Sequence, residues 1–274
     1  MKWRVITSGI GRAADNMAID EAIVKAHAAG QVPPTIRFYG WQPAAVSLGY
    51  FQKAAVEVDL AECRRLGIDV VRRLTGGRAV LHDTELTYSI IVSEKHPLVP
   101  ATITASYRFF SQGLMAGLNL LGIEAQMTMP RSAYGQTKRQ PVSAACFDAP
   151  SHYEVTFDGR KLIGSAQVRK EGVVLQHGSL LLGFDPVKVA AVLNLPTPEA
   201  KDKLAAMLGK RAISLAQAAK REIGWEEAYQ ALQSAFGPAL GIELVADSLT
   251  QAEQAMAREL ASNKYGQDAW NLLR

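Results

Sequence analysis

Residues 69–83, Asp-Val-Val-Arg-Arg-Leu-Thr-Gly-Gly-Arg-Ala-Val-Leu-His-Asp, form the most informative stretch of this 274-residue sequence. Aliphatic residues flank a central turn, and they predict two strands, at 69–74 and 79–81. The turn contains Gly76 and Gly77, whose backbone can approach a ligand closely because neither residue has a side chain. The turn could therefore hold an anionic or carbonyl-bearing group, or it could simply join the two strands.

Arginine is concentrated around this turn, at Arg64, Arg65, Arg72, Arg73 and Arg78. The first two belong to a helical pattern at 59–66 and are expected to face solvent. Arg72 before the turn and His82 after it could contact a bound group. The stretch matches neither a Walker phosphate loop, which needs Gly-Lys-Ser/Thr, nor a Gly-x-Gly-x-x-Gly turn that opens a helix.

Outside this stretch, strands dominate the first part of the chain and helices follow residue 185. Further strands are predicted at 35–39, 45–50, 85–92, 153–157, 161–163, 173–182 and 242–246, and helices at 17–29, 59–66 and 104–121. Helix starts are indicated by Asp185-Pro186, by Thr197-Pro198, and by capping boxes at Ser214–Gln217 and Ser248–Gln251. The pattern predicts an α/β chain with an α+β layout, in which helices flank mixed or antiparallel sheets.

The composition is that of an ordinary globular protein, with 48% hydrophobic and 20% charged residues. The net charge of +4 and the pI of about 9.0 favour acidic partners, but the sequence has no Lys/Arg run of the nucleic-acid-binding type. No apolar run is long enough to span a bilayer, and the N-terminus lacks the pattern of a signal peptide. We therefore expect neither a nucleic-acid nor a membrane partner.

The two cysteines, Cys63 and Cys146, lie far apart without Cys-x-x-Cys spacing, which argues against a disulfide or zinc site and indicates a reducing, cytoplasmic location. Cys63 falls at helical spacing among leucines and is expected to be a small buried filler. Cys146 follows an aperiodic stretch at 131–142 and could be a nucleophile or an inert thiol. The Asp158-Gly159 pair predicts a hairpin turn that would bring Lys161 toward the Cys146 segment.

Three histidines, His82, His152 and His177, lie near these features. A Cys-His or Ser-His-Asp arrangement can be drawn from them, but their spacing selects none. No His/Asp pairing indicates a metal site.

Several motifs together resemble the biotin/lipoate transferase superfamily. They are 72–83, the run Gly159-Arg-Lys-Leu-Ile-Gly-Ser-Ala-Gln167, Gln176-His-Gly-Ser179, Asn16–Glu21, Lys264-Tyr265 and Trp270-Asn271. Within it, Cys146–Ser151 and Ile36–Trp41 are most similar to octanoyltransferases that move octanoate from acyl carrier protein to the glycine cleavage H protein. The sequence departs from many relatives at Arg78, where they have a third glycine.

The resemblance implies a catalytic domain of the biotin/lipoate protein ligase fold, with a single domain over 1–274, a core at 33–247 and a C-terminal helical segment at 248–274. It implies that Cys146 carries the acyl group as a thioester and that Lys161 lowers the pKa of that thiol. Neither a cofactor nor a metal is implied. The expected donor is octanoyl-acyl carrier protein, and the expected acceptor is the H protein or another lipoyl-domain protein. The implied substrate-binding residues are Arg72, Gly76, Gly77, His82, Gly164 and Ala166.

Three other functions stay open from the sequence. An ATP-dependent lipoate-protein ligase would share the Lys161 motif but would need no nucleophilic thiol. An amidotransferase that moves octanoyl from H protein to dehydrogenase subunits would also use a cysteine. A noncatalytic acyl-protein binder would keep the fold without forming a covalent intermediate.

Overall fold

The computed structural model describes residues 1–128 and 154–273, and its main feature is a large mixed sheet. Within these residues the sheet has eight strands, in the order β11 (Glu243–Ala246), β1 (Lys2–Gly11), β2 (Thr35–Trp41), β6 (Glu85–Ser93), β10 (Val173–Leu181), β9 (Arg160–Lys170), β8 (Glu154–Phe157) and β7 (Gln126–Thr128). Strand β1 runs parallel to both β11 and β2, and all other neighbours are antiparallel.

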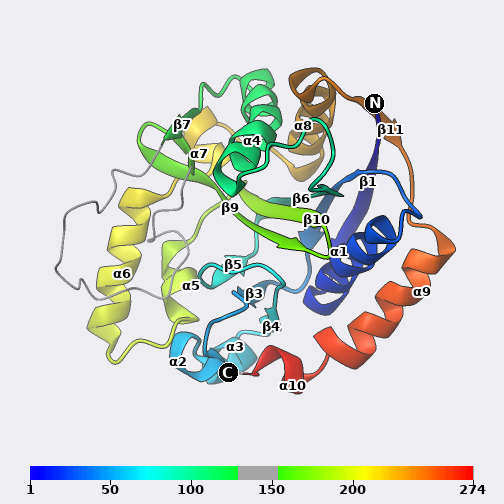
Figure 1. Ribbon diagram of the computed structural model, residues 1–274. Coiled ribbons are helices and arrows are strands. Elements are labelled where there is room, and N and C mark those ends of the chain that lie inside the picture. Colours follow the sequence, from blue (N-terminus) through cyan, green and yellow to red (C-terminus); the bar gives the residue numbers. More distant parts are fainter. Residues whose placement is uncertain (129–153, 274) are drawn as a thin grey trace.

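A smaller sheet carries the glycine turn. Its order is β4 (Asp69–Arg72), β3 (Ala45–Leu48) and β5 (Val80–His82). The described helical segments are α1 (Ala13–Ala28), α2 (Ala54–Glu57), α3 (Leu60–Arg65), α4 (Ile103–Leu120), α5 (Pro186–Ala191), α6 (Pro198–Arg211), α7 (Leu215–Ala219), α8 (Trp225–Leu240), α9 (Gln251–Leu260), the π-helical turn Ala261–Tyr265 and α10 (Asp268–Asn271). In Figure 1, α4 and α8 lie together beside the main sheet, α1 and α9 lie together elsewhere, and α5 and α6 flank the small sheet.

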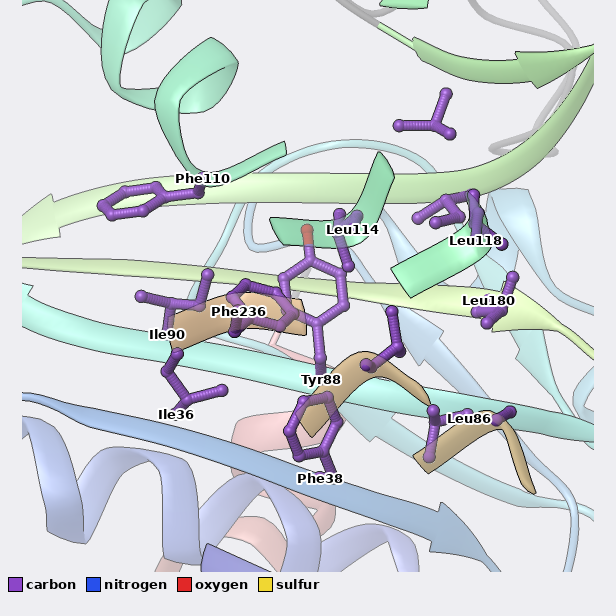
Figure 2. Packing of buried hydrophobic residues seen from close by; sticks show 14 of the residues in the cluster. Ile36, Phe38, Leu86, Tyr88, Ile90, Phe110, Leu114, Leu118, Leu180 and Phe236 are labelled. Atoms are coloured by element: carbon purple, nitrogen blue, oxygen red, sulfur yellow. The ribbon is translucent and has the colours of Figure 1, made fainter. Parts of the chain in front are cut away.

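The largest core fills the space between the main sheet and the α4–α8 pair. Figure 2 shows side chains of β2 and β6, including Phe38 and Tyr88, directed toward Leu114 of α4 and Phe236 of α8. The rings of Phe38 and Phe236 lie edge to face with centroids 6.0 Å apart. The two helices approach closely at Gly113, where an added Cβ would lie 2.3 Å from the ring of Phe236. Burial of this apolar surface stabilises the packing of the α4–α8 pair on the main sheet.

Most predicted elements are confirmed within one to four residues. The Asp158-Gly159 hairpin joins β8 to β9 with positive φ at both residues, 50° and 70°. The capping box at Ser214–Gln217 is present. The one predicted at Ser248–Gln251 is wrong, because Thr250 and Glu253 form the box two residues later. Strands β1 and β7 were not predicted.

The structure belongs to the predicted mixed α/β class. Strand β1 and helix α1 precede residue 33 and pack within the main assembly, while α9 and α10 follow residue 248. A buried ion pair between Arg4 of β1 and Glu253 of α9 joins the two ends of the chain. The proposed boundaries at 33 and 248 stay a prediction about folding units. Over the described residues, no helix is long and apolar enough to cross a membrane.

Candidate active site

A buried cavity lies where α1, the small sheet and the middle of β9 and β10 meet. Its lining combines aromatic rings, two histidines and glycine-rich backbone: Met17, Tyr39, Trp41, Ser47, Arg73, Val80, His82, Thr87, Gly164, Ser165, Ala166, His177, Gly178 and Ser179. Three of the residues predicted to bind substrate, His82, Gly164 and Ala166, are therefore brought together here.

Arg73 holds the glycine turn through hydrogen bonds to its backbone. Its guanidinium is buried and donates to the carbonyl oxygens of Gly76 and Arg78, both at 2.8 Å. Gly77 has φ of +96°, a conformation that favours glycine. The turn itself packs against Gly49, where an added Cβ would lie only 2.0 Å from the carbonyl oxygen of Gly77. The turn is thus held rigidly at the edge of the cavity, although Gly76 and Gly77 are outside its lining.

Arg72, the neighbouring residue, has a different position. Side chains alternate along a strand, so Arg72 of β4 points away from Arg73. It is fully buried and donates to the carbonyl oxygens of Gly49, Tyr50 and Gln52 and of Trp270 and Asn271. Arg72 therefore joins the C-terminal helix α10 to the segment that supports the glycine turn, and it does not line the cavity.

His82 is held by an acid on one side and a hydroxyl on the other. Its Nδ1 lies 2.7 Å from Oε1 of Glu85, and its Nε2 lies 2.7 Å from Oγ of Ser47. Its ring stacks on Trp41 with centroids 4.0 Å apart. The same carboxylate oxygen accepts hydrogen bonds from the hydroxyls of Thr87 (2.5 Å) and Ser179 (2.8 Å). Packing and hydrogen bonds together fix the orientation of the imidazole.

His177 has a similar environment on the other side of the cavity. Its Nε2 lies 2.7 Å from Oγ1 of Thr75, and its Nδ1 lies 3.6 Å from Asp20. Burial lowers the pKa of His177, partly opposed by Asp20, so the ring is neutral at neutral pH. Burial would raise the pKa of Asp20, but Arg37, 2.7 Å away, and His177 more than offset this effect, so that pKa is lowered. Asp20 is therefore a buried, ionised anchor.

Lys161 begins β9 and is 4% exposed. Its Nζ donates to Oε1 of Glu154 on β8 at 2.8 Å, so the hairpin places the two charged groups side by side. Arg160 precedes it and is partly exposed, as strand alternation predicts. Cys146, the predicted nucleophile, lies outside the described residues, as does His152.

Cys63 is buried within α3, and burial raises its pKa to about 11. This confirms the prediction that it fills the core and shows why its thiolate is disfavoured at neutral pH. Among the described residues, no group of three or more His, Cys, Asp or Glu side chains could hold a metal ion.

Sequence reasoning missed Ser47 and Trp41 of the cavity wall, and it missed Asp20 and Glu85, the carboxylates that hold the two histidines of that wall. Asp20 and Trp41 lie within motifs that were recognised, Asn16–Glu21 and Ile36–Trp41, so those motifs contained the signal. No pattern in the sequence pointed to Ser47, because its role depends on the pairing of β3 with β5, which places it near His82.

Comparison with known proteins agrees with this architecture. The model of the lipoyl protein ligase A/B catalytic domain matches residues 12–237. Among solved structures, the bipartite lipoate protein ligase of Thermoplasma acidophilum superposes with a TM-score of 0.82 at 29% identity, covering 100% of this chain and 98% of the other. Lipoate-protein ligase A bound with ATP gives 0.80 at 28% identity, covering 99% of both.

The sequence identity to enzymes named octanoyltransferase is higher than the identity to these ligases. Octanoyltransferase LipM of Geobacillus kaustophilus is 46% identical over 273 residues, which is 99% of this chain and 98% of the relative. The protein of the same name from Kyrpidia tusciae is 48% identical over 269 residues, 98% of both chains.

The fold is that of the biotin/lipoate protein ligase class. The chain belongs to the lipoyl protein ligase A/B catalytic domain family. With relatives of such high identity and coverage, it is an acyltransferase enzyme.

Proposed function

We propose that this enzyme transfers an octanoyl group from octanoyl-acyl carrier protein to a lysine of a lipoyl-domain protein, such as the glycine cleavage H protein, in lipoate biosynthesis. The observation that carries the proposal is near full-length similarity, at 46% identity, to an octanoyltransferase. The cavity supports it, since its aromatic and glycine-rich lining suits a short acyl chain. An eight-carbon chain gains roughly 0.8 kcal/mol of binding free energy per buried methylene.

The reaction would proceed in two steps through Cys146. First, the Cys146 thiolate attacks the donor thioester, a new C–S bond forms, and the carrier protein leaves as its own thiolate. Second, a neutral lysine amine attacks the acyl-enzyme, an amide C–N bond forms, and the Cys146 sulfur leaves and takes up a proton. The first step exchanges one thioester for another and therefore needs no nucleotide.

Lys161 is proposed to favour the reactive thiolate. A cysteine titrates near 8.5 without perturbation, so only a few per cent is ionised at neutral pH. A nearby ammonium stabilises the thiolate and lowers that pKa. The burial of Lys161 limits screening of its charge by water, while the ion pair with Glu154 offsets part of that charge.

The test is the mass of the intact protein after mixing with octanoyl-carrier protein in the absence of ATP. Wild type and Cys63→Ala should each gain one octanoyl group that hydroxylamine removes, and Cys146→Ala should gain none. A stable adduct on Cys146→Ala would show that another residue carries the acyl group.

An ATP-dependent lipoate-protein ligase is the second candidate, favoured by the structural similarity to lipoate-protein ligase A bound with ATP. It predicts that free octanoate or lipoate plus ATP modifies a lipoyl domain, and that Cys146→Ala retains this activity. If that reaction were as fast as transfer from the carrier protein, the ligase function would replace the one proposed here.

A further inference from the structure

A second cleft lies at one end of the main sheet, beyond the ends of β2 and β10. Two indole rings, Trp41 and Trp225, contribute to its walls, and three carboxylates lie along it, those of Asp83, Glu85 and Glu222. Trp41 also lines the buried cavity, so the cleft and the cavity share a wall.

Glu85 is the unusual group in this cleft. It is 4% exposed, and its Oε1 accepts hydrogen bonds from His82, Thr87 and Ser179. Its second oxygen, Oε2, is buried with no hydrogen-bond partner among the residues that the structure describes. A buried carboxylate oxygen without a donor is costly, so the geometry points to a donor supplied by a ligand.

The chemistry of the cleft favours a cationic donor on an apolar stem. Asp83 is already paired with Lys188 at 2.6 Å, which leaves the buried Glu85 as the anchor and Glu222 as an exposed acidic residue at the cleft. Indole rings pack well against methylene groups and attract cations. The indole N–H of Trp225 is also buried, and none of the described residues accepts a hydrogen bond from it, so the ligand should offer a hydrogen-bond acceptor as well.

A lysine within a polypeptide meets all of these requirements, because it has a methylene stem, an ammonium group and neighbouring backbone carbonyl oxygens. We propose that this cleft receives the acceptor lysine, and that Oε2 of Glu85 accepts a hydrogen bond from its ammonium group. The inference rests on the proposed function, since it assigns the site of the second substrate.

The strand register relates the cleft to Lys161. Glu85 of β6 pairs with Leu181 of β10, and Leu180 pairs with Ile163 of β9, two residues from Lys161. Glu85 and Lys161 therefore lie at the same end of the sheet, with one strand between theirs. Two strand spacings amount to about 10 Å. An amine bound at Glu85 would thus lie about two strand spacings from the start of β9, which carries Lys161.

The ammonium must lose one proton before its nitrogen can attack. Glu85 would accept that proton, and the neutral amine would then form the amide bond while the Cys146 sulfur leaves and takes the second proton from the nitrogen. Protonated Glu85 returns its proton to solvent after the product dissociates. Charge and atoms balance without any further reactant.

The experiment separates the two half-reactions in Glu85→Gln. Glutamine keeps an acceptor oxygen for His82 but replaces Oε2 by an amide group. We expect Glu85→Gln to slow transfer to a lipoyl domain about 10- to 100-fold, as for loss of a hydrogen bond to a charged group, and to slow formation of the octanoyl-enzyme clearly less. Discharge by hydroxylamine, a neutral nucleophile at pH 7.5, should be unchanged. Glu226→Gln, an exposed charge neutralised on α8 outside the cleft lining, is the control.

Binding can be measured without the reaction. The indole ¹⁵N–¹H signal of Trp225 should shift when Nα-acetyl-lysine methylamide is added to wild type, and it should not shift in Glu85→Gln. Normal transfer by Glu85→Gln, or no shift in wild type, would overturn the inference while acyl-enzyme formation stands. If wild type forms no acyl-enzyme, the proposed function fails instead, and the indole shift still decides whether the cleft binds an amine.

Discussion

Replacing Gly49 by alanine should displace the glycine turn and reduce both stability and activity. The new Cβ would lie 2.0 Å from the carbonyl oxygen of Gly77 and 3.2 Å from the carbonyl carbon of Gly76, so backbone must move by more than an ångström. Little slack exists, because Arg73 holds the turn through two 2.8 Å hydrogen bonds. Overpacking costs about 1–3 kcal/mol, and a clash with backbone belongs at the upper end, about 3 kcal/mol.

Gly209→Ala is the matched control for this substitution. Gly209 lies within α6, and its added Cβ would have only an ordinary contact, 3.8 Å from Pro186. This variant should gain about 0.5–1 kcal/mol, because alanine restricts the unfolded chain more than glycine does. Urea unfolding measures both changes, and acyl-enzyme formation reports on the turn. Equal stability of Gly49→Ala and the parent would refute the packing argument, and full activity in a destabilised Gly49→Ala would remove the turn from the active site.

Three further predictions concern ionisable groups. In a Cys63→Ala background, Lys161→Ala should shift the pH profile of iodoacetamide labelling of Cys146 upward by about one unit. Arg160→Ala, the control, should shift this profile little. If the Lys161→Ala profile coincided with that of the parent, Lys161 would not be the activator. Because burial raises the pKa of Cys63 to about 11, labelling of the native protein below pH 9 should reach one thiol, and two rapidly labelled thiols would contradict the buried position. Asp20→Asn should destabilise the protein by about 3–5 kcal/mol at pH 7, because it leaves Arg37 buried without its carboxylate. The pKa of Asp20 is lower in the folded state than in the unfolded chain, so the stability that ionised Asp20 contributes is present above its unfolded-state pKa and is lost as the pH falls through its folded-state pKa. The difference in urea midpoint between wild type and Asp20→Asn should therefore become smaller below pH 4. A difference that stays constant with pH would contradict this expectation.

Local signals in the sequence were enough to predict the hairpin, the Ser214 capping box and the buried Cys63. Each depends on residues a few positions apart, and neighbouring side chains decide the outcome. The position of β1 was not predictable in the same way. It pairs in parallel with β11, about 240 residues later, and such pairing is selected by the packed core rather than by local spacing.

The two arginines of the motif illustrate the same limit within the site. Alternation along a strand implies that Arg72 and Arg73 point to opposite sides, but it does not say which one meets the cavity. The choice between the two arginines depends on α10, where the carbonyl oxygens of Trp270 and Asn271 accept hydrogen bonds from Arg72. The C-terminal motif is therefore explained by support of the glycine turn, a relation that spans almost 200 residues and has no local signature.

The two histidines of the cavity are held in a way that bears on its affinity for an acyl chain. A carboxylate beside Nδ1 of His82 can only accept, so that nitrogen carries a proton, and Nε2 lies within hydrogen-bond distance of the hydroxyl of Ser47. Arg73 donates to the same hydroxyl at 3.0 Å and to that of Thr75 at 3.1 Å, and the hydroxyl of Thr75 in turn lies against the neutral His177. The polar groups of this wall thus satisfy one another. An alkyl chain can enter such a cavity without stripping water from unpaired polar atoms, which is the condition under which burial of methylene groups contributes its full free energy.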